Sequence, residues 1–231
     1  MKRFYRDVAV TSTEDGYQTE LDGRPVKTQG GQPQRVPSRA LAERLAAEWE
    51  HQGEEIDPHA FVLRDLVDYS LDIVPGARAA TITKLLRYAE TDTLCYRAEP
   101  DEPLWHRQRE IWDPLLEALE AREGVTLERV SGIIHRPHSR DALARLQARL
   151  ETYDDFMLAT LEMATSLAAS LCIGLAALEP DADGDALWNA ANLEEDWQAE
   201  NWGVDEQAAE LREKRRRDFL QTIEFAQIAR S

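Results

Sequence analysis

The chain has 231 residues, of which 43% are hydrophobic and 31% are charged, so it is long enough to form one or two globular domains with a sizeable core. Asp and Glu total 44 against 27 Lys and Arg, which gives a formal net charge of -17 at pH 7. Because nucleic acids and anionic lipids are bound through Lys and Arg, this charge argues against both as partners and favours a soluble monomer.

The first elements predicted along the chain are short strands, at residues 8–10, 17–21 and 24–28. The dipeptides Asp15-Gly16 and Asp22-Gly23 separate them, and both residue types tolerate the positive φ that a two-residue hairpin turn needs. Gly23 is therefore assigned a structural role. Pro25 has no N–H to donate to a sheet, so its strand is expected at an edge.

After Pro37 the apolar spacing changes to that of helices. Ser38 suits a helix N-cap, and the apolar positions of residues 39–52, which include Trp49, recur at helical spacing. Trp49 is read as structural, packing between two domains. Further helices are expected at residues 63–73, 79–90, 103–122, 183–201 and 205–229, with two or three more within 139–178. Residues 125–133 could form a short strand or an extended connection.

The pattern predicts an α+β protein. Pro75-Gly76 is expected to end one helix and to mark a boundary between a small mixed α/β domain with β-hairpins, residues 1–76, and a mainly helical domain, residues 77–231. The uncharged apolar stretch from Met163 to Leu178 is shorter than the ~20 residues that a bilayer span requires. It is therefore expected to be a helix buried in a protein core, and no membrane insertion is expected.

No residue pattern indicates catalysis or a bound cofactor. His135 and His138 lack a third metal ligand at suitable spacing, and Pro137 lies between them, so a polar loop is the better reading. No phosphate-binding glycine loop or Gly-x-Ser-x-Gly motif is present. Cys95 and Cys172 stand in no metal or redox spacing and are read as buried thiols in a reducing compartment. The chain opens without a signal-peptide core or transit segment, which favours a cytosolic protein or a mature form that has already been cleaved.

Two charged segments of the C-terminal third attract attention. The basic run Lys214 to Arg217 follows several glutamates, so pairing at helical spacing, such as Glu210 with Lys214, explains it.

In the segment before this basic run, a continuous helix would place two apolar stripes on opposite sides. One stripe contains Trp188, Ala191, Glu195, Ala199 and Trp202, and the other contains Ala190, Leu193 and Trp197. A lone acid such as Glu195 among tryptophans is either functional or part of a buried ion pair.

Several spaced motifs run along nearly the whole chain. They are Lys2-Arg3-Phe4-Tyr5, Leu21-Asp22-Gly23-Arg24-Pro25-Val26-Lys27-Thr28, Ala47-Glu48-Trp49-Glu50, Ile56-Asp57-Pro58, the segment from Tyr88 through Asp92 and Tyr96-Arg97 to Ala98, Gln108-x-x-x-Trp112-Asp113-Pro114-Leu115, and Leu193-x-Glu195-x-x-Gln198-x-x-x-Trp202-Gly203-x-Asp205. In this order they resemble the alpha-subunit assembly chaperones of ATP synthase, the family called ATP synthase F(1) complex assembly factor 2 in mitochondria. Asp68 and Tyr69 depart from it, since the family commonly has Asn and a small residue there.

The resemblance implies a chaperone that binds the unassembled alpha subunit, prevents its aggregation and hands it on for assembly with the beta subunit. It implies no catalysis and no cofactor, and it places the protein in the bacterial cytoplasm, with relatives in the mitochondrial matrix. The residues expected to contact the client are Glu195, Trp202, Glu200, Glu194 and Trp197. Those expected to be structural are Trp49, Gly23, Asp92, Tyr96 and Arg97.

Two other functions remain open from the sequence. One is an interaction module for a different client, and the other is an enzyme with a carboxylate site in the C-terminal domain. Co-purification with the alpha subunit from cells that lack the beta subunit would distinguish the chaperone from both.

Overall fold

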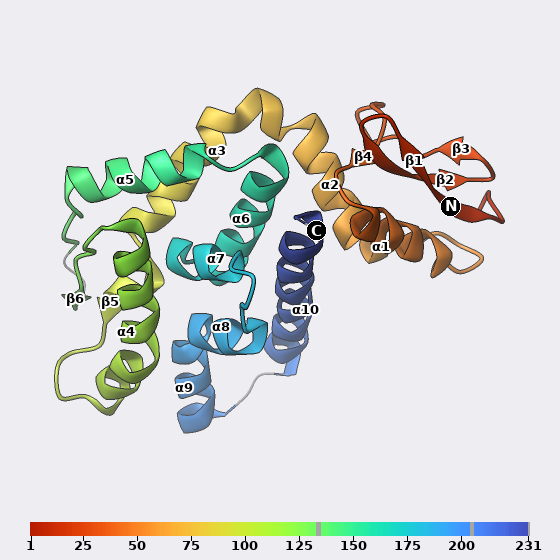
Figure 1. The fold of residues 1–231 in the computed structure, drawn as a ribbon. Helices are drawn as coiled ribbons and strands as arrows, with labels where there is room; N and C mark the ends of the chain where they lie inside the picture. Colours follow the sequence, from red (N-terminus) through yellow and green to blue (C-terminus); the bar gives the residue numbers. More distant parts are fainter. Residues whose placement is uncertain (133–134, 204–205, 231) are drawn as a thin grey trace. The chain divides into compact units, whose positions relative to one another are not determined.

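The computed structural model describes residues 1–132, 135–203 and 206–230, and its fold is α+β, as the sequence predicts (Figure 1). Two compact units can be distinguished. The N-terminal unit comprises Met1–Arg78 together with the later segments Asp154–Thr160 and Glu224–Ser231, and the second unit comprises Ala79–Tyr153 and Leu161–Ile223. The chain thus returns twice to the N-terminal unit, so each unit contains segments that are distant in sequence.

A small antiparallel sheet forms the first part of the N-terminal unit. Its strands are β1 (Val8–Thr13), β2 (Gly16–Leu21), β3 (Arg24–Pro25) and β4 (Arg35–Val36), and β2 pairs with each of the other three. Asp22 and Gly23 connect β2 to β3 with φ angles of 49° and 72°, so the predicted turn is present. Pro25 lies in β3, whose one partner strand among the described residues is β2, which is the edge position expected for proline.

Gly16 occupies a position that only glycine fits. Thr13 pairs with Gly16, so Glu14 and Asp15 form the turn, one residue earlier than the sequence suggests. Gly16 has a φ of +136°, and a Cβ added there would lie 2.4 Å from the carbonyl oxygen of Val36. Backbone strain and this clash act together, because the obstructing atom belongs to the main chain of β4.

We therefore expect Gly16→Ala to lower the free energy of unfolding by about 3 kcal/mol. Gly23→Ala is the matched control: it also has a positive φ, but nothing lies within 4 Å of the added Cβ. We expect it to cost about 1 kcal/mol. Urea denaturation of both variants measures the difference, and equal losses would show that the contact with Val36 does not matter.

Two helices of this unit follow the sheet in the chain and contribute to its core. The Ser38 side chain accepts a hydrogen bond from the Leu41 N–H and so caps α1 (Arg39–Glu50), as predicted; α2 (Val62–Asp72) follows the short 3-10 helix η1 (Pro58–Ala60). Trp49 on α1 is 8% exposed, and its ring centroid lies 4.5 Å from that of Phe61. The buried cluster around it consists of Tyr5, Leu21, Val26, Trp49, Ile56 and Phe61. These residues all belong to the N-terminal unit, so the expectation that Trp49 packs between two domains gives way to packing within one.

Two carboxylates of α2 hold the loop that precedes β4. Asp68 is buried and accepts hydrogen bonds from the Gln34 side chain and the Gln29 N–H. One turn later, Asp72 accepts from the Thr28 hydroxyl and the Gly30 N–H. The face of α2 on which Asp68 departs from the family pattern therefore has a structural use in this chain, since it fastens a loop to a helix.

The remaining elements are mostly helices: α3 (Val74–Glu90), α4 (Pro103–Glu123), α5 (Arg140–Glu151), α6 (Asp155–Ala168), α7 (Leu171–Ala177), α8 (Gly184–Ala191), α9 (Leu193–Trp202) and α10 (Glu206–Ala229). Between α3 and α5, the 3-10 helix η2 (Thr93–Cys95) leads into β5 (Tyr96–Arg97), which pairs in parallel with β6 (Val130–Ser131). Pro75 and Gly76 lie in the first turn of α3, where a missing N–H costs little, so the predicted helix at residues 79–90 begins five residues earlier.

The long apolar stretch is divided into two helices. α6 ends at Ala168, Ala169 has a φ of 50°, and the Ser170 side chain caps α7 by accepting from the Ile173 N–H. The stretch expected to be one buried helix is thus a buried helix-turn-helix. In the described parts of the chain, no helix is both long and apolar enough to cross a bilayer.

Candidate functional site

The segment richest in tryptophan and carboxylates lies at α8 and α9, which stand beside α10 (Figure 1). The expected continuous stripe from Trp188 to Trp202 is wrong, because Asn192 interrupts the helix. Its side-chain amide and its N–H both donate to the Trp188 carbonyl, and α9 starts with a new orientation. Trp188 is 1% exposed, whereas Trp202 is 77% exposed. The two tryptophans therefore do not share an environment.

Glu195 also differs from the sequence-based expectation. Its side chain is exposed, and it forms no hydrogen bond or ion pair with another described residue. The alternative of a buried ion pair is therefore wrong as well. Glu195 instead presents an unpaired carboxylate on the first turn of α9, where the helix dipole favours a negative charge.

One side of α9 is fastened to α4. Arg107 donates two hydrogen bonds to the Glu200 carboxylate, at 2.6 and 2.9 Å, and its guanidinium lies 5.9 Å from the Trp197 ring centroid. The next residue of α4, Gln108, donates to Glu194 at 2.7 Å. Three of the five predicted contact residues, Glu194, Trp197 and Glu200, thus take part in attaching α9 to α4.

The two glutamates in this attachment have opposite pKa shifts. The hydrogen bonds from Arg107 lower the pKa of Glu200, whereas burial raises the pKa of Glu194 despite the hydrogen bond from Gln108. As the pH falls, Glu194 is therefore the first of the two to take up a proton. The ion pair at Glu200 then remains as the more acid-resistant contact.

The opposite side of α9 faces a groove. It has a volume of about 800 Å³ and lies between the helices α8 and α9 on one side and the N-terminal half of α10 on the other. Trp202 and Leu211, which are 77% and 61% exposed, contribute apolar surface, and Glu195 stands beside them. The described residues that line it are Trp188, Asn189, Glu195, Gln198, Ala199, Trp202, Gly203, Ala208, Ala209, Leu211, Arg212, Glu213, Arg215 and Arg216.

Trp202 also borders a second, smaller hollow of about 290 Å³ beside the first turn of α4. Pro103, Leu104 and Trp197 are among its other walls. The Trp202 ring is thus an exposed apolar feature with a recess on either side. Asp205, the last residue of the motif that includes Trp202, lies outside the described residues.

Ion pairs set the spacing of the groove walls. Arg212 on α10 contacts Asp196 on α9 at 2.6 Å, and Arg216 contacts Asp185 on α8 at 2.5 Å. Arg215 donates instead to the Leu167 carbonyl. Pairing at helical spacing occurs between Glu213 and Arg216, at 3.2 Å. The predicted pair of Glu210 with Lys214 is wrong, because neither exposed side chain forms a hydrogen bond or an ion pair with a described residue. Two residues of the basic run, Arg215 and Arg216, therefore join α10 to neighbouring helices.

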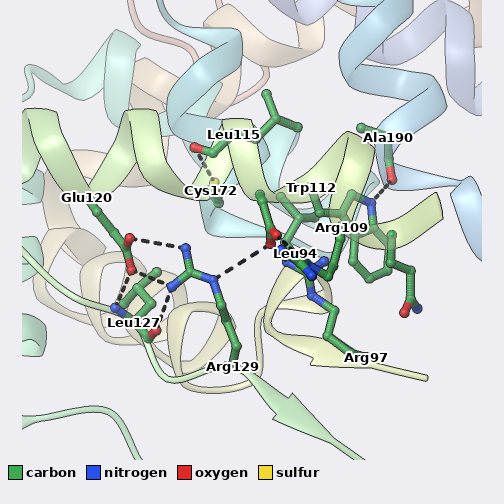
Figure 2. A network of polar contacts seen from close by, with 12 residues as sticks. Leu94, Arg97, Arg109, Trp112, Leu115, Glu120, Leu127, Arg129, Cys172 and Ala190 are labelled. Carbon is green, nitrogen blue, oxygen red and sulfur yellow. Dashed lines mark hydrogen bonds and ion pairs between the residues drawn. The ribbon is translucent and has the colours of Figure 1, made fainter. Parts of the chain in front are cut away.

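A second polar cluster, which includes Arg97, Arg109, Glu120 and Arg129, lies on and beside α4 (Figure 2). Arg97 on β5 donates to Asp113 at 2.8 Å and lies 5.1 Å from the Trp112 ring centroid, and Arg109 approaches the same carboxylate at 3.2 Å. Arg129, close to β6, pairs with Glu120 at 2.9 Å. Because Arg97 is only 6% exposed, the cluster fastens β5 and β6 onto α4, which supports a structural role for Arg97.

The other residues considered for chemistry are used in packing. The His138 Nδ1 accepts from the Glu128 N–H and its Nε2 faces the Ala89 carbonyl, both at 2.9 Å, while His135 contacts the Tyr96 hydroxyl. Burial raises the pKa of Cys95 to about 12 and that of Cys172 well above its usual value. Among residues 1–132, 135–203 and 206–230, no three potential ligands gather as a metal site would require.

Sequence reasoning missed Arg107, Gln108 and Arg212 as parts of this site. Their sequence separations from their partners on α9 range from 16 to 93 residues in the chain, and only the fold brings the pairs together. Gln108 does stand in a recognised motif, but the motif itself does not reveal that its amide meets Glu194.

Comparison with known proteins places the chain in a family. The family described as "ATP12 chaperone protein" matches residues 2–120. The mitochondrial protein atp12 of Schizosaccharomyces pombe is 27% identical over 222 residues, covering 91% of this chain and 76% of that protein.

Two solved structures are similar over almost the entire chain. Atp12 from Paracoccus denitrificans superposes with a TM-score of 0.92 and 32% identity, covering 99% of this chain and 98% of that one. The Atu1473 protein from Agrobacterium tumefaciens also gives a TM-score of 0.92, with 35% identity, covering 100% of this chain and 86% of that one. The chain therefore belongs to the ATP12 chaperone family, which confirms the resemblance inferred from its spaced motifs.

Proposed function

We propose that this protein binds the newly made, unassembled alpha subunit of the F(1) sector of ATP synthase. It keeps that subunit from aggregating and releases it when the beta subunit takes its place. The protein acts as a monomer in the bacterial cytoplasm, without catalysis and without a cofactor. Membership of the ATP12 chaperone family supports the proposal, and so does the open groove beside α9.

The observation that carries the proposal is the exposed Trp202 at the edge of this groove. A free alpha subunit must expose the apolar surface that the beta subunit later covers, and such a surface aggregates unless something protects it. Trp202 and Leu211 offer apolar area for this purpose, and tryptophan is enriched at the centres of protein interfaces. The unpaired carboxylate of Glu195 can then fix the register of the client by pairing with a cation.

The structure divides the five expected contact residues into two groups. Glu195 and Trp202 face the groove and are proposed to contact the client directly. Glu194, Trp197 and Glu200 are proposed to position α9 through Arg107 and Gln108. A direct role for Glu200 is thus less favoured than the sequence alone suggests, because Arg107 already occupies both of its oxygens.

Trp202→Ala is expected to leave the melting curve unchanged and to weaken binding of the alpha subunit at least about tenfold. Glu195→Gln is expected to act in the same direction with a smaller loss, since it removes charge but retains shape. The measurement is light scattering by purified alpha subunit in the presence of each variant, together with a thermal melt. Glu210→Gln is a suitable control, because Glu210 is exposed on α10 but does not line the groove.

A destabilised Glu195→Gln protein whose folded fraction still protects the alpha subunit would contradict the interface assignment. The identity of the client is tested separately, by capture from cells that lack the beta subunit followed by mass spectrometry. Recovery of another protein instead of the alpha subunit, with normal F(1) assembly in a deletion strain, would favour an interaction module for a different client.

A further inference from the structure

The N-terminal unit contains a cleft that the proposed function does not use. Its volume is about 550 Å³, and it opens beside β3. The residues that line it are Phe4, Tyr5, Leu21, Asp22, Arg24, Pro25, Val26, Lys27 and Trp49. All of them belong to the N-terminal unit, so the cleft is complete within that unit.

The walls of the cleft are apolar. Tyr5, Leu21, Val26 and Trp49 are each less than 10% exposed, yet Phe4 at the rim is 61% exposed although it stacks edge-on against Tyr5 at 5.3 Å. A large exposed aromatic side chain next to an apolar recess is a common feature of binding surfaces. Trp49 also contributes an indole N–H that is buried without an acceptor, which leaves one hydrogen-bond donor unused among the wall residues.

The rim carries two cations that are held in no ion pair with a described residue. Arg24 and Lys27 are exposed, and neither side chain forms a hydrogen bond or an ion pair with a described residue. Asp22 is the one acid of the rim, and its carboxylate is occupied because it accepts from the N–H groups of Arg6 and Asp7 at 3.0 and 2.9 Å. Arg24 is close enough to help lower the pKa of Asp22, after the backbone N–H groups of Asp7 and Arg6, but the donor groups of Arg24 and Lys27 remain open to a partner.

This positive charge is local. Residues 1–35 contain six Lys and Arg against five Asp and Glu, a net charge of +1, whereas the whole chain carries -17. An acidic partner is therefore repelled by most of the protein and accepted best at this cleft.

The shape of the edge restricts how a partner can bind. Pro25 has no N–H, so β3 is poorly suited to receive an added strand by backbone hydrogen bonding. Insertion of a side chain into the recess fits better. We propose that the cleft beside β3 binds an acidic polypeptide segment of a partner protein, which inserts a large apolar side chain between Phe4 and Trp49 while its carboxylates pair with Arg24 and Lys27.

The test uses the full chain and a fluorescein-labelled peptide with one phenylalanine flanked by two glutamates on each side. Fluorescence anisotropy should show saturable binding that weakens as salt is added. Peptides with alanine in place of phenylalanine, or with lysines in place of the glutamates, should bind at least about tenfold more weakly. Because the protein is acidic overall, charge alone does not explain binding of the glutamate peptide.

The double variant Arg24→Glu/Lys27→Glu should lose at least about tenfold in affinity, and Phe4→Ala should also weaken binding. Lys214→Glu/Arg217→Glu changes the net charge equally at exposed positions of α10 and should stay within about twofold of the wild type. The proposal is overturned if the glutamate peptide does not bind, or if both double variants lose affinity equally. It is also overturned if the protein dimerises through this cleft, which light scattering would reveal as a dimer that only Arg24→Glu/Lys27→Glu dissociates.

Discussion

Trp49→Arg is expected to unfold the N-terminal unit, with a loss of free energy of unfolding on the order of 3–5 kcal/mol or more. The indole packs against Phe61 at 4.5 Å and edge-on against Tyr5 at 5.5 Å, so its removal opens a hole in the core. A guanidinium in its place would be buried at a position only 8% exposed. Arg64, whose guanidinium lies 3.9 Å from the Phe61 ring centroid, adds like-charge repulsion.

Trp202→Arg is the matched control, because it makes the same chemical change at a tryptophan that is 77% exposed. Its melting temperature should stay close to that of the wild type, whereas Trp49→Arg should be poorly soluble and melt early. Circular dichroism melts of the two purified variants, with Trp49→Phe as a conservative third, provide the comparison. A Trp49→Arg protein that has a normal melting curve but no longer protects the alpha subunit would instead indicate that Trp49 contacts the client.

The parts of the fold that were predictable are those governed by neighbouring residues. The turn at Asp22-Gly23 follows from two adjacent residues that accept positive φ, and the start of α1 follows from Ser38 capping the Leu41 N–H. The end of α4 at Gly124 is equally local, since this glycine adopts a φ of 65°. In each case, a residue's preference for a positive φ or for a capping hydrogen bond is satisfied by groups within a few residues of it in the chain.

The parts that escaped prediction depend on distant contacts. Nothing near Asn192 in sequence signals a helix break, yet the break decides which residues of α9 reach the groove. The chain's two returns to the N-terminal unit, at Asp154–Thr160 and Glu224–Ser231, likewise rest on packing rather than on local pattern. The tryptophan-rich segment could be located from its composition. The different environments of Glu195 and Glu200 could not be predicted, because Arg107, which pairs with Glu200, lies 93 residues from it in the chain.

Asp92 offers the clearest case of such a distant contact, and its removal is the second large effect that we expect. Its carboxylate is fully buried at the start of η2, where it accepts from the Leu94 N–H. The same side chain accepts from the Ser170 hydroxyl and the Cys172 N–H at the start of α7, almost 80 residues away. One carboxylate thus satisfies donors of two helix starts, although burial raises its pKa.

Asp92→Ala should therefore lower the free energy of unfolding by about 3–5 kcal/mol, because it leaves three buried donors without an acceptor and creates a small cavity. Asp92→Asn retains the shape and one acceptor oxygen but turns an amide N–H₂ toward those donors, so its loss should be intermediate. Thr91→Ala removes an exposed hydroxyl at the neighbouring position and should change stability by less than about 0.5 kcal/mol.

Ser170→Ala tests the hydrogen bond between Asp92 and Ser170 from its other end. The double variant with Asp92→Ala should lose less free energy of unfolding than the sum of the two single changes, since both remove the same contact. Strictly additive losses in urea denaturation would mean that the hydrogen bond between Asp92 and Ser170 does not stabilise the protein.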